Sequence, residues 1–219
     1  MKFFRDRVEA GKRLASVLKD VVGENAIVLA IPRGGVVVGF EVARGLNLPL
    51  DIIVPRKIGA PENPELAIGA MAENGVIILD DSLVSYLQVS ESYIKRESEN
   101  QRLEIERRLK MYRGDVPRPK LKNREVVIVD DGIATGSTMK AALASVRKSG
   151  AKRVIVAIPV GPPSTIRELE KQADFVVCLH TPESFYAIGE FYENFAQTED
   201  EEVKRLLKLS AQEVLKSRR

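Results

Sequence analysis

Residues 126–138 read VVIVDDGIATGST, and this stretch decides the fold that we expect. Four apolar residues run into two adjacent aspartates, Asp130 and Asp131, which are followed by a loop of small residues. A short continuous apolar run is typical of a strand in a parallel sheet that is covered on both faces. In open α/β sheets, ligands bind beyond the carboxyl ends of such strands, where these aspartates lie. The stretch therefore predicts a buried parallel strand that ends at a ligand site.

Four more apolar runs predict further strands, and helix-like patterns lie between them. Alternation of strands and helices at these lengths is typical of βαβ units with right-handed crossovers. We therefore expect an α/β fold with a parallel, Rossmann-like sheet and helices on both faces. The expected strands are 26–31, 51–54, 125–129, 153–160 and 174–179, and the expected helices between or before them are 8–22, 34–45, 137–149 and 163–172.

Two other segments predict structure outside this alternation. The runs 66–72 and 75–79 suggest a hairpin that turns between Glu73 and Gly75. Residues 81–113 are helical in pattern and highly charged, so we expect a charged helical insertion. It has a narrow, mostly apolar face that consists of Ile94, Gln101, Ile105, Leu109 and Tyr112.

Composition limits the classes of function. The chain has 219 residues, 44% of them hydrophobic and 30% charged, which is typical of one main globular domain. The net charge of +3 is too balanced to argue for nucleic acid or a membrane surface, and no segment reaches the ~18 apolar residues of a membrane span. Cys178 is the only cysteine, so no internal disulfide is possible. We expect a cytoplasmic protein with no membrane partner.

The residues around the aspartates indicate the ligand. Two carboxylates at a strand end can accept hydrogen bonds from the vicinal hydroxyls of a sugar. Small residues at 134–138 allow backbone N–H groups to close around an anion at the start of the next helix. Together these groups describe a ribose 5-phosphate. The simpler alternative, a strand-end turn with one aspartate capping the helix, explains only one carboxylate.

This stretch resembles the phosphoribosyl pyrophosphate (PRPP) binding motif of type I phosphoribosyltransferases. The resemblance implies that Asp130 and Asp131 bind the ribose hydroxyls. Two positions depart from the family pattern: Ala134, which is often Asp in enzymes for 6-oxopurines, and Gly132, where a branched apolar residue is commoner. Hypoxanthine and guanine therefore become less expected substrates. The resemblance also implies a loop that holds the 5-phosphate, consisting of Ala134, Thr135, Gly136, Ser137 and Thr138.

A second loop, IPRGG at 31–35, follows the first strand and opens a helix. It fits the family's pyrophosphate loop, so the resemblance implies that Arg33, Gly34 and Gly35 bind pyrophosphate. Taken alone, the stretch is equally a tight turn into a helix. It lacks the glycine spacing of a dinucleotide fold and the Lys-Ser/Thr of a nucleotide P-loop.

A third segment, PRKIGAPENPELAIG at 55–69, is a basic loop that can close over the site as the family's mobile loop does. Closure would exclude water, and Arg56 and Lys57 would neutralise the leaving pyrophosphate. The alternative is a surface loop with incidental charge. We expect Lys57, Arg56 and Asp131 as catalytic residues. We expect Mg²⁺ to be held mainly by PRPP, so no metal site made by the protein alone is assigned.

The resemblance implies a PRPP-dependent pentosyltransferase that transfers the 5-phosphoribosyl group to a nitrogenous base, with release of pyrophosphate. It is closest to uncharacterised phosphoribosyltransferases that share the PRGG and DDG-x-ATG elements, and the acceptor is unidentified. We expect one domain over residues 1–219, with a core at about 25–80 and 120–180, the insertion at about 81–113 and a hood with a terminal helix at about 181–219. The hood contains the aromatic residues Phe185, Tyr186, Phe191 and Tyr192, which form either a stacking platform or the packing of the last helix. We expect a structural role for His180 rather than contact with a ligand.

A rival hypothesis is a non-catalytic regulator that senses PRPP and binds nucleic acid or a partner protein. Its support is residues 94–113, which hold seven bases against four acids. Pairs such as Glu104 with Arg108 at i,i+4 spacing match much of this charge internally, so we do not expect nucleic acid as a partner. Retention of Lys57 favours catalysis. We expect a homo-oligomer.

Overall fold

The computed structural model describes residues 2–217 and contains a five-stranded sheet in the order β2-β1-β6-β7-β8. All neighbouring strands in this sheet run parallel, with Val28 of β1 opposite Val127 of β6. The expected parallel α/β sheet is therefore confirmed. Its strands are β1 (Ile27–Ala30), β2 (Leu50–Ile52), β6 (Glu125–Val129), β7 (Arg153–Val160) and β8 (Phe175–His180).

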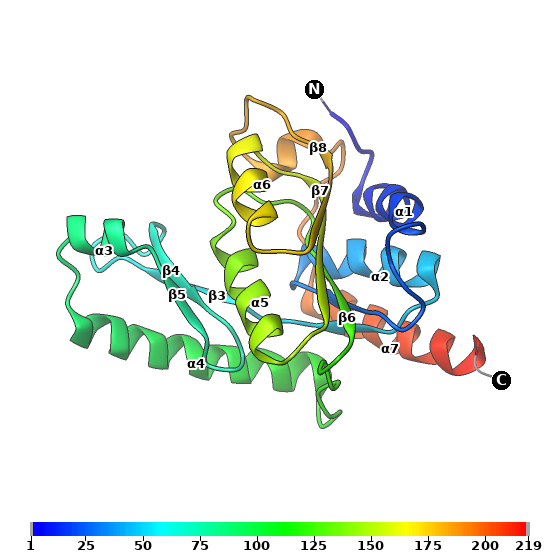
Figure 1. The fold of residues 1–219 in the computed structure, drawn as a ribbon, viewed down its shortest axis with the longest axis horizontal. Helices are drawn as coiled ribbons and strands as arrows, with labels where there is room; N and C mark the ends of the chain where they lie inside the picture. The colour runs from blue at the N-terminus through cyan, green and yellow to red at the C-terminus, as the bar shows by residue number, and fades with distance from the viewer. Residues whose placement is uncertain (1, 218–219) are drawn as a thin grey trace.

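Helices cover both faces of this sheet. Successive side chains of β6 point to opposite faces, and because residues 126–129 are all apolar, each face forms a core with a pair of helices. Val127 and Val129 pack with residues of α1 and α2, whereas Val126 and Ile128 pack with residues of α5 and α6. Figure 1 shows these two helix pairs on opposite sides of the sheet. The helices are α1 (Arg7–Leu18), α2 (Gly34–Leu46), α5 (Ser137–Lys148) and α6 (Pro163–Glu170).

A second unit, which we call the arm, extends to the left of the core in Figure 1. It contains a three-stranded antiparallel sheet in the order β3-β4-β5 and two helices. Ile58 and Ile68 of this sheet are fully buried against Ile105 and Tyr112, so the sheet packs on the narrow apolar face predicted for the charged helix. The elements of the arm are β3 (Arg56–Gly59), β4 (Ala67–Met71), β5 (Ile77–Leu79), α3 (Asp81–Tyr86) and α4 (Glu91–Arg113).

The arm confirms the predicted hairpin and corrects two other expectations. The strands β4 and β5 pair antiparallel around a turn in which Gly75 has a φ of +74°. The segment 55–69, expected as a loop, instead begins with the strand β3, because Lys57 pairs with Ala70 in the sheet. The helix expected over 81–113 is interrupted at Gln88, whose φ is +52°, and α4 starts afresh with Ser90 as its N-cap.

The chain after β8 divides into two parts. Residues 181–197, which we call the hood segment, include the short 3-10 helix η1 (Ile188–Phe191) and bury Phe191 and Tyr192 against Phe4. Helix α7 (Asp200–Ser217) then packs on α2, α4 and β2. Among residues 2–217, no helix has both the length and the apolar character that crossing a membrane requires.

Candidate functional site

Two loops meet at the carboxyl edge of the parallel sheet. One joins β1 to α2 and includes a cis peptide bond between Pro32 and Arg33, and the other joins β6 to α5. A Cβ atom on Gly34 would overlap the carboxylate of Asp131, and one on Gly35 would lie 2.8 Å from Oδ1 of Asp130. Glycine is therefore required at both positions by close approach. The structure brings together the residues predicted to bind pyrophosphate and those predicted to bind ribose.

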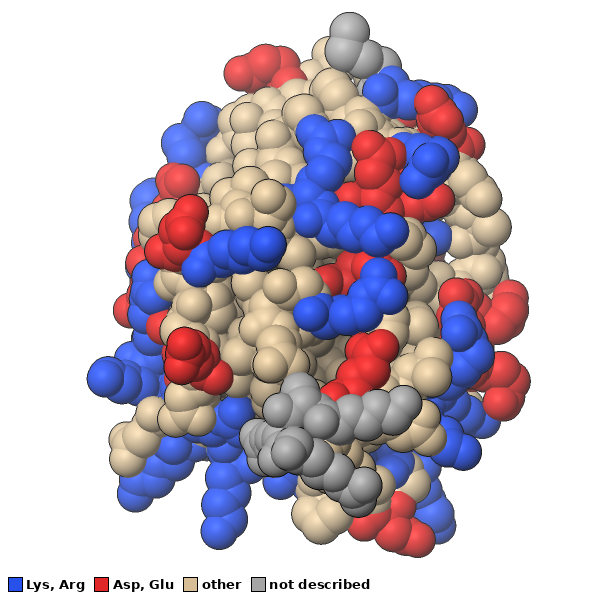
Figure 2. Space-filling view, turned by 90° about the vertical axis from the view of Figure 1, so that its right-hand side faces the viewer, with Lys and Arg blue, Asp and Glu red and all other residues tan. Residues whose placement is uncertain are grey.

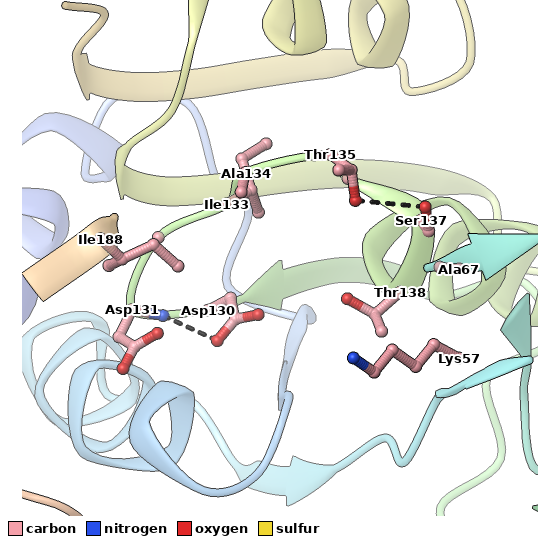
Figure 3. A pocket seen from close by; sticks show the side chains of 12 residues that line it. Lys57, Ala67, Asp130, Asp131, Ile133, Ala134, Thr135, Ser137, Thr138 and Ile188 are labelled. Atoms are coloured by element: carbon pink, nitrogen blue, oxygen red, sulfur yellow. Dashed lines mark hydrogen bonds between the residues drawn. The ribbon is translucent and has the colours of Figure 1, made fainter. Parts of the chain in front are cut away.

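A first cavity of about 250 Å³ opens beside the loop that follows β6. Figure 3 shows Lys57, which reaches it from the arm, with its Nζ directed toward the side of Asp130. Thr135 and Ser137 lie on the side of the cavity away from Asp131, with their hydroxyl oxygens 3.2 Å apart. All five residues predicted to hold a 5-phosphate line this cavity at the N-terminal end of α5, together with Asp130, Asp131, Gly132, Ile133, Lys57, Ala67 and Ile188.

A second cavity of about 300 Å³ adjoins the first and is strongly basic. The two cavities share Lys57, Asp130, Asp131 and Thr138 in their linings. Basic side chains converge on the second cavity from the β1–α2 loop, from β3 and from α4. Its charged lining consists of Arg33, Arg56, Lys57, Arg108, Asp130 and Asp131.

Arg108 is the residue of this basic group that the sequence analysis missed. It comes from α4, where its Nε donates to Glu104 at 2.7 Å. A signal was available, because Arg108 lies three residues after Ile105 and four before Tyr112, and residues at these spacings share one face of a helix. The charged helix of the arm therefore forms part of the wall of the candidate site.

Arg56 shows how closely these bases are packed. Its Nε donates to Oε1 of Gln101 at 2.9 Å, which fixes the side chain against α4. Burial, and then the positive charge of Arg108, lower the pKa of the Arg56 guanidinium. An anion in the second cavity would relieve this repulsion, so the arrangement favours a ligand with negative charge.

Lys57 is held more loosely. Its Nζ is 2.6 Å from Oε2 of Glu65, and the two side chains are 41% and 87% exposed. Exposed ion pairs of this kind are weak, so Lys57 can exchange Glu65 for a ligand at little cost. Its backbone, by contrast, is fixed in β3 by pairing with β4.

The two aspartates have different surroundings. The carboxylate of Asp131 makes an ion pair with Arg7, with Nε and Oδ2 separated by 2.7 Å, and the hydroxyl of Tyr192 donates to its carbonyl at 2.6 Å. The backbone N–H of Asp131 donates to Oδ1 of Asp130 at 2.8 Å. Burial, and then the negative charge of Asp131, raise the pKa of Asp130 well above 3.8. The sequence did not indicate that Arg7 or Tyr192 contacts Asp131.

Gly132 departs from the family pattern for a reason that the structure supplies. A Cβ atom on Gly132 would lie 2.6 Å from Cγ2 of Ile188, which comes from η1 and lines the first cavity. The hood segment thus fills the space that a branched side chain at position 132 would occupy.

Most of the aromatic residues of the hood segment are buried in packing contacts. Phe191 and Tyr192 are 4% and 2% exposed, and Phe185 packs on Phe191 with ring centroids 5.0 Å apart. Tyr186 is 85% exposed but belongs to neither cavity lining among the described residues. Phe185, Phe191 and Tyr192 are therefore packing residues, but they pack with Phe4 and one another in a cluster that, among the described residues, includes no residue of α7, so the expected packing of the last helix does not explain them.

His180 has a structural role, as expected. Its ring stacks on Phe3 with centroids 4.1 Å apart, and Arg13 contacts Nε2 at 3.0 Å. Burial, and then the charge of Arg13, lower the pKa of His180. The half-buried thiol of Cys178 donates to the carbonyl of His180 at 3.2 Å, and burial raises its pKa to about 12.

The fold and site define a parallel α/β protein with a polar site at the carboxyl edge of the sheet. The sheet loops supply the two aspartates and Arg33, and the arm supplies the other bases. Residues 6–196 match the family described as the phosphoribosyl transferase domain, and the chain belongs to this family. The resemblance found in residues 126–138 is thereby confirmed.

Individual relatives agree with this assignment. Two Mycobacterium tuberculosis proteins, from strains CDC 1551 and H37Rv, are each 45% identical over 207 residues and are provisionally named phosphoribosyl transferases. The match covers 94% of this chain and 47% of each relative, so the chain spans about half the length of these curated relatives. A crystal structure of the Thermus thermophilus protein TT1426 is similar to this chain with a TM-score of 0.81 and 43% identity, over 94% of this chain and 98% of that one.

Proposed function

We propose that this chain is a PRPP-dependent phosphoribosyltransferase that transfers the 5-phosphoribosyl group to a nitrogenous acceptor and releases pyrophosphate. The observation that carries the proposal is the convergence of separate segments, among them the loops after β1 and β6, the strand β3 and the helix α4, on two adjoining cavities. Small residues at a helix start line the first cavity, bases line the second, and Asp130 and Asp131 belong to both. PRPP carries a phosphate and a pyrophosphate on opposite sides of one ribose, which matches this order of groups.

Each part of PRPP is assigned to one part of the site. The 5-phosphate is placed at residues 134–138, where the N-terminus of α5 favours an anion. The ribose hydroxyls are placed at Asp130 and Asp131, which the two cavities share. The pyrophosphate is placed in the second cavity, beside Gly34, Gly35 and its charged partners Arg33, Arg56, Lys57 and Arg108.

The reaction needs little covalent help from the protein. A nitrogen of the acceptor forms a bond to the anomeric carbon while the bond from that carbon to pyrophosphate breaks. Pyrophosphate leaves with the electron pair, and the acceptor nitrogen loses its proton. Negative charge grows on the leaving group in the transition state, and the bases of the second cavity are placed to stabilise it.

The residues present fit a magnesium ion that arrives with the substrate. Within the described chain, no cluster of three or more His, Cys, Asp or Glu side chains is placed to hold a metal. Both Asp130 and Asp131 line the basic cavity, and the carboxylate of Asp131 is already paired with Arg7. Mg²⁺ bound to PRPP would keep several waters and would neutralise part of the leaving group's charge.

The charges of α4 give the regulatory alternative little support, because several of its bases are paired within the helix. Arg102 pairs with Glu99 and Glu106, and Arg107 pairs with Glu104, so these bases are matched by acids of the same helix. Figure 2 shows Lys and Arg mixed with Asp and Glu on the face that carries the end of α7, rather than one continuous basic patch. A cytoplasmic location and a homo-oligomeric state remain predictions from the sequence.

Position 134 bears on the choice of acceptor. Ala134 is exposed and lines the first cavity. Because this position is often Asp in enzymes for 6-oxopurines, we propose that hypoxanthine and guanine are poor acceptors. Adenine-type acceptors remain compatible with Ala134.

The experiment is release of pyrophosphate from PRPP and Mg²⁺, measured against a panel of purine and pyrimidine bases. Binding to nucleic acid is measured in parallel. We expect one or more bases to support release, with hypoxanthine and guanine among the weakest. PRPP binding without turnover on any base, combined with nucleic-acid or partner binding, would favour the regulator instead.

A further inference from the structure

Arg7 lies beside the candidate site, and the assignments made so far give it no role. Its Nε is 2.7 Å from Oδ2 of Asp131, and the two side chains are 11% and 12% exposed. Among the described residues, the linings of both cavities include Asp131 and leave out Arg7. Arg7 therefore supports Asp131 from behind and does not stand in the space that a ligand would occupy.

The guanidinium of Arg7 also contacts two other segments. Its Nη1 donates to the carbonyl of Ala196 at 2.7 Å, and its central carbon lies 3.8 Å from the centroid of the Phe195 ring. A Cβ atom on Gly34 would come within 2.7 Å of the Arg7 Nε. One side chain of α1 thus touches the loop after β6, the loop after β1 and the hood segment.

We propose that Arg7 is a positioning residue, which fixes the carboxylate of Asp131 in the orientation that binds the ribose of PRPP. This inference rests on the proposed function. The ion pair occupies Oδ2 of Asp131, so Oδ1 is the oxygen that a ribose hydroxyl meets. The Tyr192 hydroxyl holds the carbonyl of the same residue, so side chain and backbone of Asp131 are fixed by separate partners.

The physical need for Arg7 follows from the neighbouring carboxyl group. Two acidic side chains at adjacent positions repel each other when both are ionised, and burial increases that repulsion. A guanidinium that is stacked on Phe195 and bonded to Ala196 has few alternative orientations. It can therefore hold one carboxylate in place, which a flexible Lys ammonium would do less well.

The test measures the Kd of PRPP with Mg²⁺ by calorimetry for wild type, Arg7→Gln, Arg7→Lys and Arg13→Gln. Arg13 is the matched control, because it lies on the same helix, contacts His180 and lies over the ring of Phe4 at 4.8 Å. We expect Arg7→Gln to weaken PRPP binding by roughly 10-fold to 100-fold, as for loss of a charge-assisted hydrogen bond. Arg7→Lys should lie between wild type and Arg7→Gln, and Arg13→Gln should stay within about 3-fold of wild type.

A double-mutant cycle separates positioning from a general structural role. If Arg7 acts through Asp131, Asp131→Asn should weaken PRPP binding much less in the Arg7→Gln background than in wild type. Thermal unfolding of every variant is measured alongside. A residue that only stabilises the fold would lower the melting temperature without changing the Kd of the folded protein.

Three results would overturn the inference. In the first, Arg7→Gln binds PRPP as Arg13→Gln does. In the second, the effects of Arg7→Gln and Asp131→Asn are fully additive. The third applies if Arg7→Gln does not fold. The test then rests on Arg7→Lys, and a Kd equal to that of wild type for this variant would overturn the inference. Failure of the wild-type protein to bind PRPP would instead refute the proposed function, and this inference would fall with it.

Discussion

The candidate site has two sides that are built in different ways. The sheet side consists of short loops that follow the carboxyl ends of strands such as β6. Residues 126–129 of β6 are completely buried. The arm side consists of long basic side chains, Arg56, Lys57 and Arg108, that reach the cavity from β3 and α4. The sheet side can therefore hold glycines and carboxylates in fixed positions, whereas the arm side places positive charge at the ends of long side chains, of which Lys57 is held more loosely than Arg56. This difference predicts that the sheet side governs ground-state binding and the arm side governs the transition state.

The largest expected effect tests the arm side. Lys57→Ala should lower kcat by roughly 10² to 10³-fold, because charge on the leaving pyrophosphate develops mainly in the transition state. The Kd of PRPP should change much less. Steady-state kinetics and calorimetry measure the two quantities. Lys95→Ala is the control, since Lys95 lies on the arm but lines a different cavity. Unchanged turnover in Lys57→Ala would remove Lys57 from the mechanism.

The next effect tests the sheet side. Asp130→Asn and Asp131→Asn should each weaken PRPP binding by roughly 10-fold to 100-fold, because each removes a charged hydrogen-bond acceptor. Their stabilities should differ. Asp131→Asn leaves the guanidinium of Arg7 buried without its partner, which costs about 3 to 5 kcal/mol in comparable buried pairs. The acid pair is wrongly assigned if both variants bind PRPP like wild type.

A third prediction concerns both sides together. PRPP with Mg²⁺ at ~100 times its Kd should stabilise the folded protein by roughly 2.7 kcal/mol. A domain of this size gains about 2 to 4 °C in melting temperature per kcal/mol, so a rise of roughly 5 to 10 °C is expected. Ribose 5-phosphate engages the sheet side alone and should stabilise less at equal concentration. NAD⁺ is the control, and a shift with NAD⁺ but none with PRPP would point to another nucleotide function.

The smallest effect distinguishes the two aspartates by pH. Because the pKa of Asp130 is raised in the folded state, the unfolded chain releases this proton first as pH rises. The contribution of Asp130 to the free energy of unfolding therefore falls as pH rises from about 4 through the raised pKa. Without ligand, Asp130→Asn should match wild type near pH 4 and melt higher at pH 8, by about 2 to 4 °C for each kcal/mol of relief.

Thermal melts from pH 4 to pH 8 measure this difference. Asp115→Asn, at an exposed position, is the control and should show no such trend. A constant difference between Asp130→Asn and wild type across the range would contradict the assigned cause.

The sequence predicted the strands best where the apolar runs were continuous. The strand expected at 125–129 has the same bounds in the structure, and the helix expected at 137–149 ends one residue earlier. The prediction from the sequence failed at residues 56–59, which form a strand although their surroundings are rich in proline and charge. That strand exists because it pairs with β4 and covers Ile105 of α4, and such contacts leave no periodic pattern in a stretch of four residues.

By itself, the sequence determined the local parts of the site. The strand, the acid pair and the small-residue loop at 126–138 are contiguous, so their chemistry is visible without knowledge of the fold. Only the tertiary structure decided which distant residues complete it. Arg7 pairs with Asp131 across 124 positions of sequence, and Arg108 reaches the second cavity from a helix of the arm. The physical reason is that backbone patterns encode contacts between near neighbours, whereas these contacts depend on crossover connections and helix packing that bring separate segments to one edge of the sheet.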